Sequence, residues 1–186
     1  MKRIVAVFLM VVLLTGCTGK RDELDRAMKL RAKMLGCLEC SFDATITADY
    51  GDELHVFAMY CQTTGQGDLQ FTVTQPETIA GITGEISSGE GKLTFDDTAL
   101  YFPLLADDQI TPVSGPWILI KTLLGGYLSA ANTEDDLLHL TIYDSYEEDA
   151  LQMEIWLNEN DAPVCAEILY DGRRIVTMNV ENFSIR

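Results

Sequence analysis

Basic side chains are scarce in this chain. It has 186 residues, of which 13 are Lys or Arg and 29 are Asp or Glu, so its formal net charge is −16. Binding of nucleic acid requires clustered Lys and Arg that displace counterions from the phosphates. The scarcity excludes nucleic acid as a partner of the main body of the chain.

Residues suited to catalysis or metal binding are scarce too. The two histidines, His55 and His139, lie apart in strand-like patterns, and no second CxxC accompanies Cys37 and Cys40. The sequence has no Gly-x-Ser-x-Gly elbow, and no Gly-rich phosphate loop precedes a helix. We therefore expect no catalytic residue, no metal site and no cofactor, and a protein that is not an enzyme.

Long apolar runs are missing except at the beginning, where residues 4–14 are all apolar and follow Lys2 and Arg3. The run is shorter than the about 20 apolar residues that span a bilayer. A basic start, an apolar run of this length and small residues after it are typical of an export signal.

The stretch that ends this segment, Leu14-Thr15-Gly16-Cys17, resembles the bacterial lipobox. The resemblance implies that residues 1–16 are removed and that Cys17 carries a diacylglyceryl thioether. Two acyl chains suffice for stable anchoring, so we expect attachment to the extracytoplasmic face of the cell membrane. The alternatives are an ordinary signal peptide with an incidental cysteine, or an uncleaved anchor.

Charge is unevenly distributed after Cys17. Residues 18–33 carry six basic and three acidic side chains, whereas the residues after 33 carry five basic and 26 acidic. Basic residues beside a membrane anchor are attracted to anionic lipid. The other interpretation is a helix with an ordinary solvated charged face, and the two are compatible.

Residues 23–35 have the pattern of a helix, with Asp22 as its cap and Gly36 as its stop. One side of this helix is apolar, and it consists of Leu24, Ala27, Met28, Met34 and Leu35. A second helical segment, residues 117–124, is apolar nearly all the way round and follows Ser114 and Pro116 as cap and first-turn residue. Such a helix must be covered on more than one side, so we expect it to lie against the concave face of a sheet.

Strand patterns account for most of the remaining chain. Alternation over residues 42–48, the turn at Gly51-Asp52 and the run 54–61 predict a hairpin that sets Phe42 opposite Cys61. Further strands are expected at 68–74, 82–87, 92–95, 99–105, 137–143, 151–157, 164–170 and 174–183. Short strands joined by tight turns indicate one antiparallel sheet, strongly curved or partly closed.

Four cysteines follow Cys17, and an even number in an exported protein makes them disulfide candidates. They are Cys37, Cys40, Cys61 and Cys165. In the expected hairpin register Cys40 lies diagonally from Cys61 on one face, which would leave Cys37 and Cys165 as a second pair. Free thiols are the alternative.

The arrangement resembles the LolA/LolB-like lipoprotein-localisation superfamily, in the form of small lipoproteins of Gram-positive bacteria. Two stretches carry the likeness: Phe71-Thr-Val-Thr-Gln-Pro76-Glu-Thr-Ile, where a strand ends in Pro, and Gly91-Lys-Leu-Thr-Phe95-Asp-Asp, which is similar to a short strand before a Phe-Asp-Gly turn. Asp97 stands where that turn has Gly. The resemblance carries over no catalytic residue.

The resemblance implies an α+β, mainly β fold. A curved antiparallel sheet would form a half-closed barrel, with an N-terminal helix and a short apolar helix covering its concave face. The expected organisation is a signal peptide at 1–16, a lipidated anchor and linker at 17–22, and one domain over 23–186.

Most apolar side chains are expected in a dry core, and some in a pocket that holds an acyl chain or an apolar peptide. The candidate ligand-binding residues are Phe42, Phe57, Phe71, Trp117, Ile120, Leu124 and Trp156. We therefore expect a membrane-anchored lipoprotein whose ligand is an acyl chain, a lipoprotein or an apolar peptide. The alternative is an adaptor that docks and regulates an exported cell-envelope enzyme.

Overall fold

A computed structural model describes residues 19–186 except residues 52, 65–66, 97, 104, 107–108 and 148–149. The signal segment and Cys17 lie outside the described residues, so the predicted lipidation stays a prediction. Within the described part of the chain, no helix combines the length and the apolar character that crossing a membrane requires.

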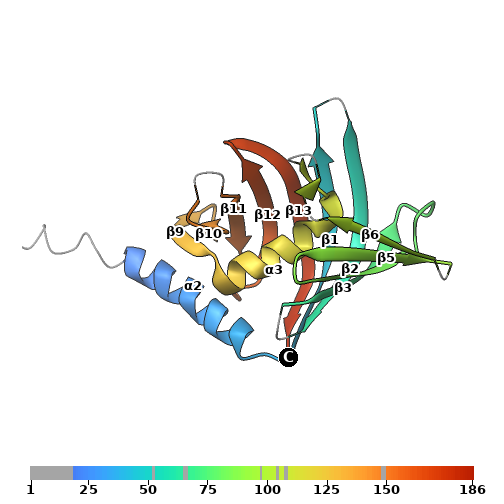
Figure 1. Cartoon of the computed structure of the whole chain (residues 1–186). Helices are drawn as coiled ribbons and strands as arrows, with labels where there is room; N and C mark the ends of the chain where they lie inside the picture. The colour runs from blue at the N-terminus through green and yellow to red at the C-terminus, as the bar shows by residue number, and fades with distance from the viewer. Residues whose placement is uncertain are drawn as a thin grey trace, which may run out of the picture.

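An eleven-stranded antiparallel sheet forms most of the structure (Figure 1). Its strands are β1 (Glu39–Asp49), β2 (Leu54–Thr64), β3 (Leu69–Gln75), β4 (Thr83–Ser87), β5 (Glu90–Phe95), β6 (Thr98–Pro103), β9 (Tyr127–Glu134), β10 (Leu137–Tyr143), β11 (Gln152–Leu157), β12 (Pro163–Tyr170) and β13 (Arg173–Ile185). The order across the sheet is β6-β5-β4-β3-β2-β1-β13-β12-β11-β10-β9. The expected open, half-closed barrel with helices on its concave face is confirmed.

The strands β1 and β13, which are the first and the last along the chain, pair with each other at the centre of the sheet. Backbone hydrogen bonds tie their ends together: Arg186 N–H donates to Glu39 O at 2.9 Å, and Leu38 N–H donates to Arg186 O at 2.9 Å. Every other pair joins strands that are consecutive within one half of the sheet. The chain therefore builds one wing outward from β1 to β6, crosses over, and returns through β9 to β13.

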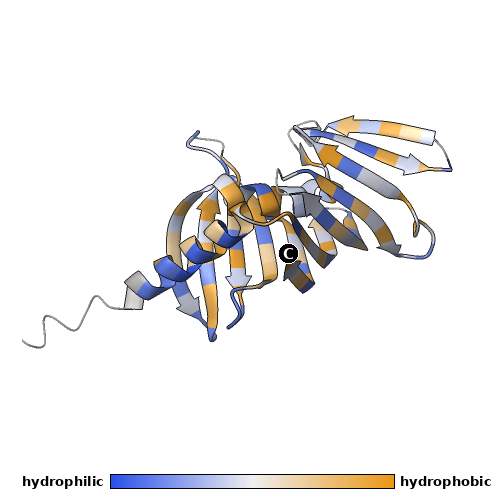
Figure 2. Ribbon diagram, turned by 90° about the horizontal axis from the view of Figure 1, so that it is seen from below, coloured by the Kyte–Doolittle hydropathy of each residue, from blue (hydrophilic) through white to orange (hydrophobic). Residues whose placement is uncertain are grey.

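The crossover between the wings runs over the concave face. It contains β7 (Leu105–Ala106), β8 (Gln109–Ile110), the 3-10 turn η1 (Pro112–Ser114) and helix α3 (Gly115–Gly125). Helix α3 is the predicted apolar helix, and most of it is buried, including Ile118, Leu119, Ile120 and Leu123. It lies beside helix α2 (Gly19–Leu35) on the same side of the sheet, as Figures 1 and 2 show.

The core lies on the concave face. Strands alternate between buried and more exposed positions, so Phe42, Ala44, Ile46 and Ala48 of β1 are all buried. Figure 2 shows hydrophobic and hydrophilic residues alternating along strands of the sheet. Period-two alternation places every second side chain on one face of a strand. The face of the sheet that carries the core is the concave face, and we call the other one the convex face.

Two details of the helices differ from expectation. Helix α2 begins at Gly19, so Asp22 lies within its first turn rather than at the cap position. The negative charge of Asp22 still stabilises the helix there, because the N-terminus carries a partial positive charge. Ser114 precedes α3 but makes no capping bond, because η1 leads directly into the helix and the Ser114 hydroxyl donates to Thr111 O at 2.6 Å.

Candidate functional site

A cavity of about 360 Å³ lies beside α3. Its walls come from α3, the β4–β5 turn, the end of β6 and the segment between β10 and β11, and they consist of Gly89, Pro103, Trp117, Ile118, Lys121, Asp144 and Leu151. Small-molecule sites in proteins occupy about 300–1,000 Å³ and are mostly apolar with a few placed polar groups. This cavity has that character and lies at the small end of the range.

The polar groups of the cavity are one amine and one carboxylate. The Lys121 amine lies 5.1 Å from the centre of the Trp117 ring, within the range of a cation–π contact. None of the ion pairs among the described residues involves Lys121. Asp144 is engaged, since its Oδ1 accepts the Leu151 N–H at 2.9 Å. Lys121 is therefore the group in the cavity wall that suits an anionic headgroup.

Helix α3 is held at its last turn by Arg31 of α2. The Arg31 Nε donates to Leu123 O at 2.7 Å, and Nη2 donates to Gly126 O at 2.9 Å. Helix α2 is itself docked, because Arg26 Nη2 lies 2.7 Å from Asp161 Oδ1 and Thr133 donates to Glu23 Oε1 at 2.6 Å. The position of the cavity wall thus depends on contacts made by α2.

The seven predicted ligand-binding residues do not share one cavity. Phe42, Phe71 and Ile120 are fully buried in the core, and Phe57 and Leu124 are half-buried against it. Only Trp117 lines the cavity beside α3. Ile118, Lys121 and Leu151 were missed as site residues, because their convergence depends on where α3 crosses the sheet.

Trp156 lies on the convex face, so the expectation that it points inward is wrong. Its neighbours Ile155 and Leu157 are fully buried in the core, and alternation places Trp156 opposite to them. There its ring stacks on His139 with 4.5 Å between centres, and its indole N–H donates to Glu134 Oε2 at 3.0 Å. His139 Nε2 also lies 2.5 Å from Glu154 Oε2, so this cluster fastens three neighbouring strands together.

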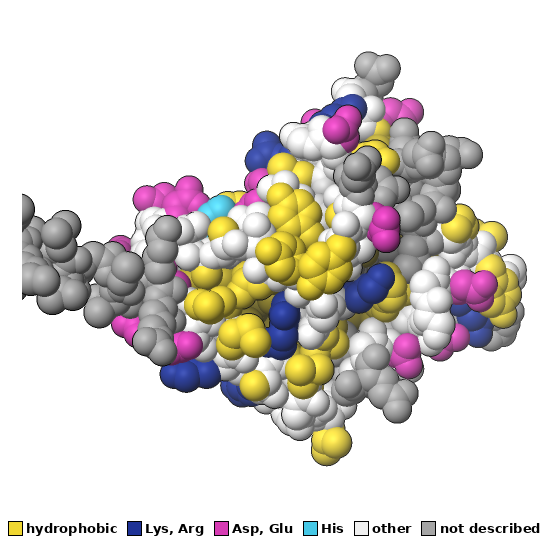
Figure 3. Space-filling model, turned by 60° about the vertical axis from the view of Figure 1, so that its left-hand side comes forward, with side chains coloured by type: hydrophobic (Ala, Val, Ile, Leu, Met, Phe, Trp, Pro, Cys, Tyr) yellow, Lys and Arg dark blue, Asp and Glu magenta, His cyan; other side chains and the backbone are white. Residues whose placement is uncertain are grey.

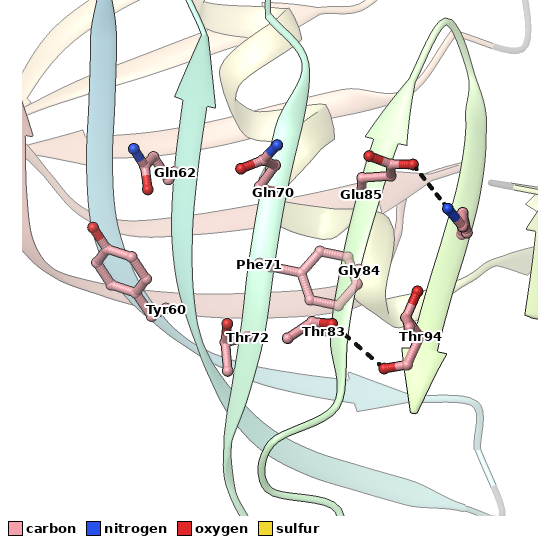
Figure 4. Close-up of a pocket in the computed structure, with 10 residues that line it drawn as sticks. Tyr60, Gln62, Gln70, Phe71, Thr72, Thr83, Gly84, Glu85 and Thr94 are labelled. Atoms are coloured by element: carbon pink, nitrogen blue, oxygen red, sulfur yellow. Dashed lines mark hydrogen bonds and ion pairs between the residues drawn. The ribbon is translucent and has the colours of Figure 1, made fainter. Parts of the chain in front are cut away.

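A second hollow, of about 300 Å³, lies on the convex face of β2, β3, β4 and β5 (Figure 4). Two rows of cross-strand neighbours line it: Tyr60, Thr72, Thr83 and Thr94 in one row, and Gln62, Gln70, Glu85 and Lys92 in the other. Glu85 and Lys92 form an ion pair at 3.5 Å. Hydroxyl and amide groups dominate this hollow, so it does not suit an acyl chain.

The packing of the Phe71 ring explains why residue 84 is a glycine. Gly84 lies directly opposite Phe71 across the strand pair, and a Cβ at Gly84 would approach Phe71 Cζ to 2.3 Å. Figure 4 shows the Phe71 ring beside Gly84. The ring therefore fills the space that a side chain at position 84 would take, and both residues line the hollow.

The four cysteines are free thiols in the structure. The expected register is present, since Phe42 pairs with Cys61 and Cys40 pairs with Thr63. Cys40 and Cys61 are diagonal neighbours, which have Cα atoms about 7–8 Å apart, slightly beyond the usual span of a disulfide. Cys165 lies on the convex face in register with Asn179 and Thr45, so the structure does not bring Cys165 and Cys37 together.

Burial of the cysteines changes their acidity. Desolvation raises the pKa of Cys40 from 9.0 to about 12, and the nearby Cys37 adds to that effect. Desolvation also raises the pKa of Cys61 well above its usual value. Among the described residues, no group of three or more His, Cys, Asp or Glu side chains is placed to hold a metal ion.

Comparison with known proteins gives similarity of fold only. No protein-family model and no curated protein matches the chain. A putative outer membrane lipoprotein-sorting protein domain from Vibrio parahaemolyticus has a TM-score of 0.45 at 9% identity, covering 90% of this chain and 93% of that one. A LolA superfamily protein from Nitrosomonas europaea has a TM-score of 0.43 at 8% identity, covering 86% and 93%.

A third similar structure is that of the CwlD amidase from Clostridioides difficile in complex with the GerS lipoprotein, with a TM-score of 0.44 at 14% identity, covering 86% of this chain and 93% of that one. Structural neighbours thus include LolA superfamily proteins and lipoproteins, as the sequence resemblance predicts. With TM-scores below 0.5, these similarities say nothing of what this chain binds.

Proposed function

We propose that this protein is a non-enzymatic lipoprotein, tethered through Cys17 outside the cytoplasm, that binds the acyl chain of an anionic amphiphile in the cavity beside α3. The observation that carries the proposal is the pairing of an apolar wall with one cation. Trp117, Ile118 and Leu151 supply apolar surface, and Lys121 lies at the same cavity without a carboxylate partner among the described residues.

The size of the cavity favours one acyl chain. At about 360 Å³, it lies near the lower limit of ordinary ligand sites, and the core beneath α3 is filled by buried side chains. Burying an apolar chain contributes about 25 cal/mol per Å² removed from water. A headgroup with a carboxylate or phosphate would remain at the cavity opening, close to the Lys121 amine.

A brominated fatty acid tests the ligand, because bromine quenches tryptophan fluorescence only at near contact and the two tryptophans lie on opposite faces of the sheet. Quenching by bound dibromostearic acid should come from Trp117 and persist in Trp156→Phe. It should be lost in Trp117→Phe. Lys121→Gln should weaken binding by about two- to fivefold, the effect of an exposed ion pair, whereas Lys92→Gln serves as the control. Equal quenching of both tryptophans, or no saturable binding, would overturn the site.

The lipid tether has its own test. Cys17→Ser should release the protein from the membrane fraction, and mass spectrometry of the wild-type chain should show a diacylglyceryl group on Cys17. Continued membrane association of Cys17→Ser at the wild-type level would contradict a thioether anchor.

A second candidate function, an adaptor for an exported enzyme, is favoured by exposed apolar side chains on the outer wing. Phe95, Leu100 and Tyr101 are 52%, 63% and 71% exposed. They lie on β5 and β6, and β6 is an edge of the sheet, where another chain could add a strand. Replacement of Leu100 by Lys should then abolish partner binding while leaving fatty-acid binding unchanged.

A further inference from the structure

The outer side of α2 carries apolar residues that the fold does not bury. Leu24, Met28 and Leu35 are 45%, 47% and 60% exposed. Their spacing of four and seven residues places them in one stripe along the helix. The sequence predicts one apolar side that these three residues share with Ala27 and Met34, and the fold buries only the Ala27 and Met34 part of it.

Helix α2 is attached to the fold by a different side. Ala27, Leu30 and Met34 are buried. The flanking bonds from Arg26 to Asp161 and from Arg31 to the end of α3 fix the helix in place. The exposed stripe therefore belongs to an ordered, docked helix and contributes little to packing.

The segment that contains α2 is basic, with six basic and three acidic residues over 18–33, whereas the chain after residue 33 has five basic and 26 acidic. Lys29 and Lys33 are exposed on α2, as are Asp22 and Asp25. At about 100° per residue, Lys29 borders the stripe and Lys33 lies nearly opposite to it. Figure 3 shows hydrophobic side chains gathered on one face of the molecule, with Lys and Arg among them and Asp and Glu around its margin. A surface of this kind complements an anionic bilayer, while the acidic remainder of the chain is repelled by it.

We propose that the exposed stripe of α2, consisting of Leu24, Met28 and Leu35, rests on the anionic surface of the membrane, with Lys29 at its border reaching the lipid headgroups. This placement depends on the proposed attachment at Cys17. Helix α2 begins at Gly19, and two residues span at most about 7 Å, so the tether holds the start of the helix at the lipid headgroups. An amphipathic helix at an interface inserts its apolar side by about 5–10 Å.

Contact along α2 would fix the orientation of the whole protein. Because α2 is docked on β9 and holds the last turn of α3 through Arg31, a helix lying on the bilayer sets the direction of the sheet and of the cavity wall. The single thioether alone would leave the protein free to rotate. The membrane is thus a second binding partner of the folded chain, in addition to being the site of its anchor.

Photo-crosslinking in vesicles tests this placement. The lipidated full chain, with benzoylphenylalanine at Met28, is reconstituted on vesicles of phosphatidylcholine and phosphatidylglycerol in a 3:1 ratio. The matched control carries the same group at Val56, which is 53% exposed on β2. We expect at least fivefold more phospholipid adduct at position 28 than at 56, and at least threefold less at 28 after Leu24→Glu combined with Leu35→Glu, which place charge in the stripe.

Each outcome is decisive. A chain that floats with the vesicles but gives equal adducts at 28 and 56 overturns the placement and leaves the anchor intact. Adducts at 28 to protein rather than lipid, whether to a second copy or another protein, also overturn it. A chain that does not float overturns the anchor, and the placement of α2 falls with it.

Discussion

Arg31 Nε donates a hydrogen bond to Leu123 O at 2.7 Å, joining the first helix of the described chain to the last turn of α3. The last four carbonyls of a helix have no partner within it, and a cation there offsets their partial negative charge. Burial lowers the pKa of Arg31 from its usual value by desolvating the charged form. The guanidinium still remains charged, since arginine does not lose its proton in proteins.

Replacing Arg31 should therefore destabilise the fold. Arg31→Ala removes the bonds to Leu123 and Gly126 and leaves buried carbonyls unpaired, so we expect a loss of about 1.5–3 kcal/mol in the free energy of unfolding. Arg31→Lys keeps the charge but lacks the planar fork, and should recover only part of that loss. Urea denaturation followed by circular dichroism measures both.

The matched control is Lys33→Ala, an exposed position two residues further along the same helix. A surface change of this kind should alter stability by no more than about 0.5 kcal/mol. If Arg31→Ala were as mild as the control, Arg31 would not be holding α3.

Sequence reasoning located the elements where local chemistry decides the structure. The turn at Gly51 and the alternation on both sides of it determine the pairing of Phe42 with Cys61, and the structure has that register. The apolar segment beginning near Pro116 is a buried helix, as predicted. In both cases the residues involved are neighbours in the chain, so their pattern suffices.

The features that the sequence did not predict depend on contacts between distant parts of the chain. Strand β9 (Tyr127–Glu134) was not predicted, because its small and polar residues show no clear alternation and its position depends on pairing with β10. The apolar side of α2 was placed correctly on the helix, but the sheet and α3 cover only part of it. Trp156 was expected inside together with the other apolar side chains, although the period of β11 places it outside.

The candidate site was predictable only in outline. Trp117 and the role of the apolar helix follow from the sequence, whereas Leu151 and Pro103 join the cavity only through the path of the chain over the concave face. The sequence did not identify Lys121 as a site residue, since a single lysine in an apolar helix is equally well explained by a position exposed to solvent.

Gly84 should tolerate no side chain. A Cβ there would approach Phe71 Cζ to 2.3 Å and the backbone oxygen of Lys92 to 2.8 Å. We expect Gly84→Ala to lower the free energy of unfolding by about 1–3 kcal/mol, the range for overpacked cores. Differential scanning calorimetry, with a lower Tm as the expected result, measures the effect.

Gly125→Ala is the matched control, because a Cβ at Gly125 meets no atom within 4 Å. It should be neutral or slightly stabilising, as alanine favours a helix over glycine by up to about 1 kcal/mol. The double variant Gly84→Ala with Phe71→Leu should be more stable than the sum of the two single effects, since the smaller side chain makes room. Additive effects would show that Phe71 is not what excludes a side chain at position 84.

The buried thiols should resist alkylation in the folded protein. With the pKa of Cys40 raised to about 12 by burial, only about one thiol in 10,000 is ionised at pH 8, and the thiolate is the reactive form. Iodoacetamide should therefore modify Cys40 and Cys61 only after unfolding, as read by mass spectrometry. The same spectra, taken before and after reduction, test the predicted disulfides, and rapid labelling of Cys40 in the folded state would contradict its burial.

Alkaline pH should destabilise the reduced protein through the same thiols. The folded state holds the Cys40 proton more tightly than the unfolded chain, because its pKa rises from 9.0 to about 12. That contribution to stability is complete below about pH 9 and decreases as the pH rises toward 12, by about 1.4 kcal/mol per pH unit. Cys40→Ala should show a shallower loss of stability between pH 9 and pH 11 in urea titrations under a reducing agent. Val56→Ala, an exposed side chain that does not titrate, should keep the wild-type slope, and identical slopes in all three proteins would show that the Cys40 thiol titrates equally in both states.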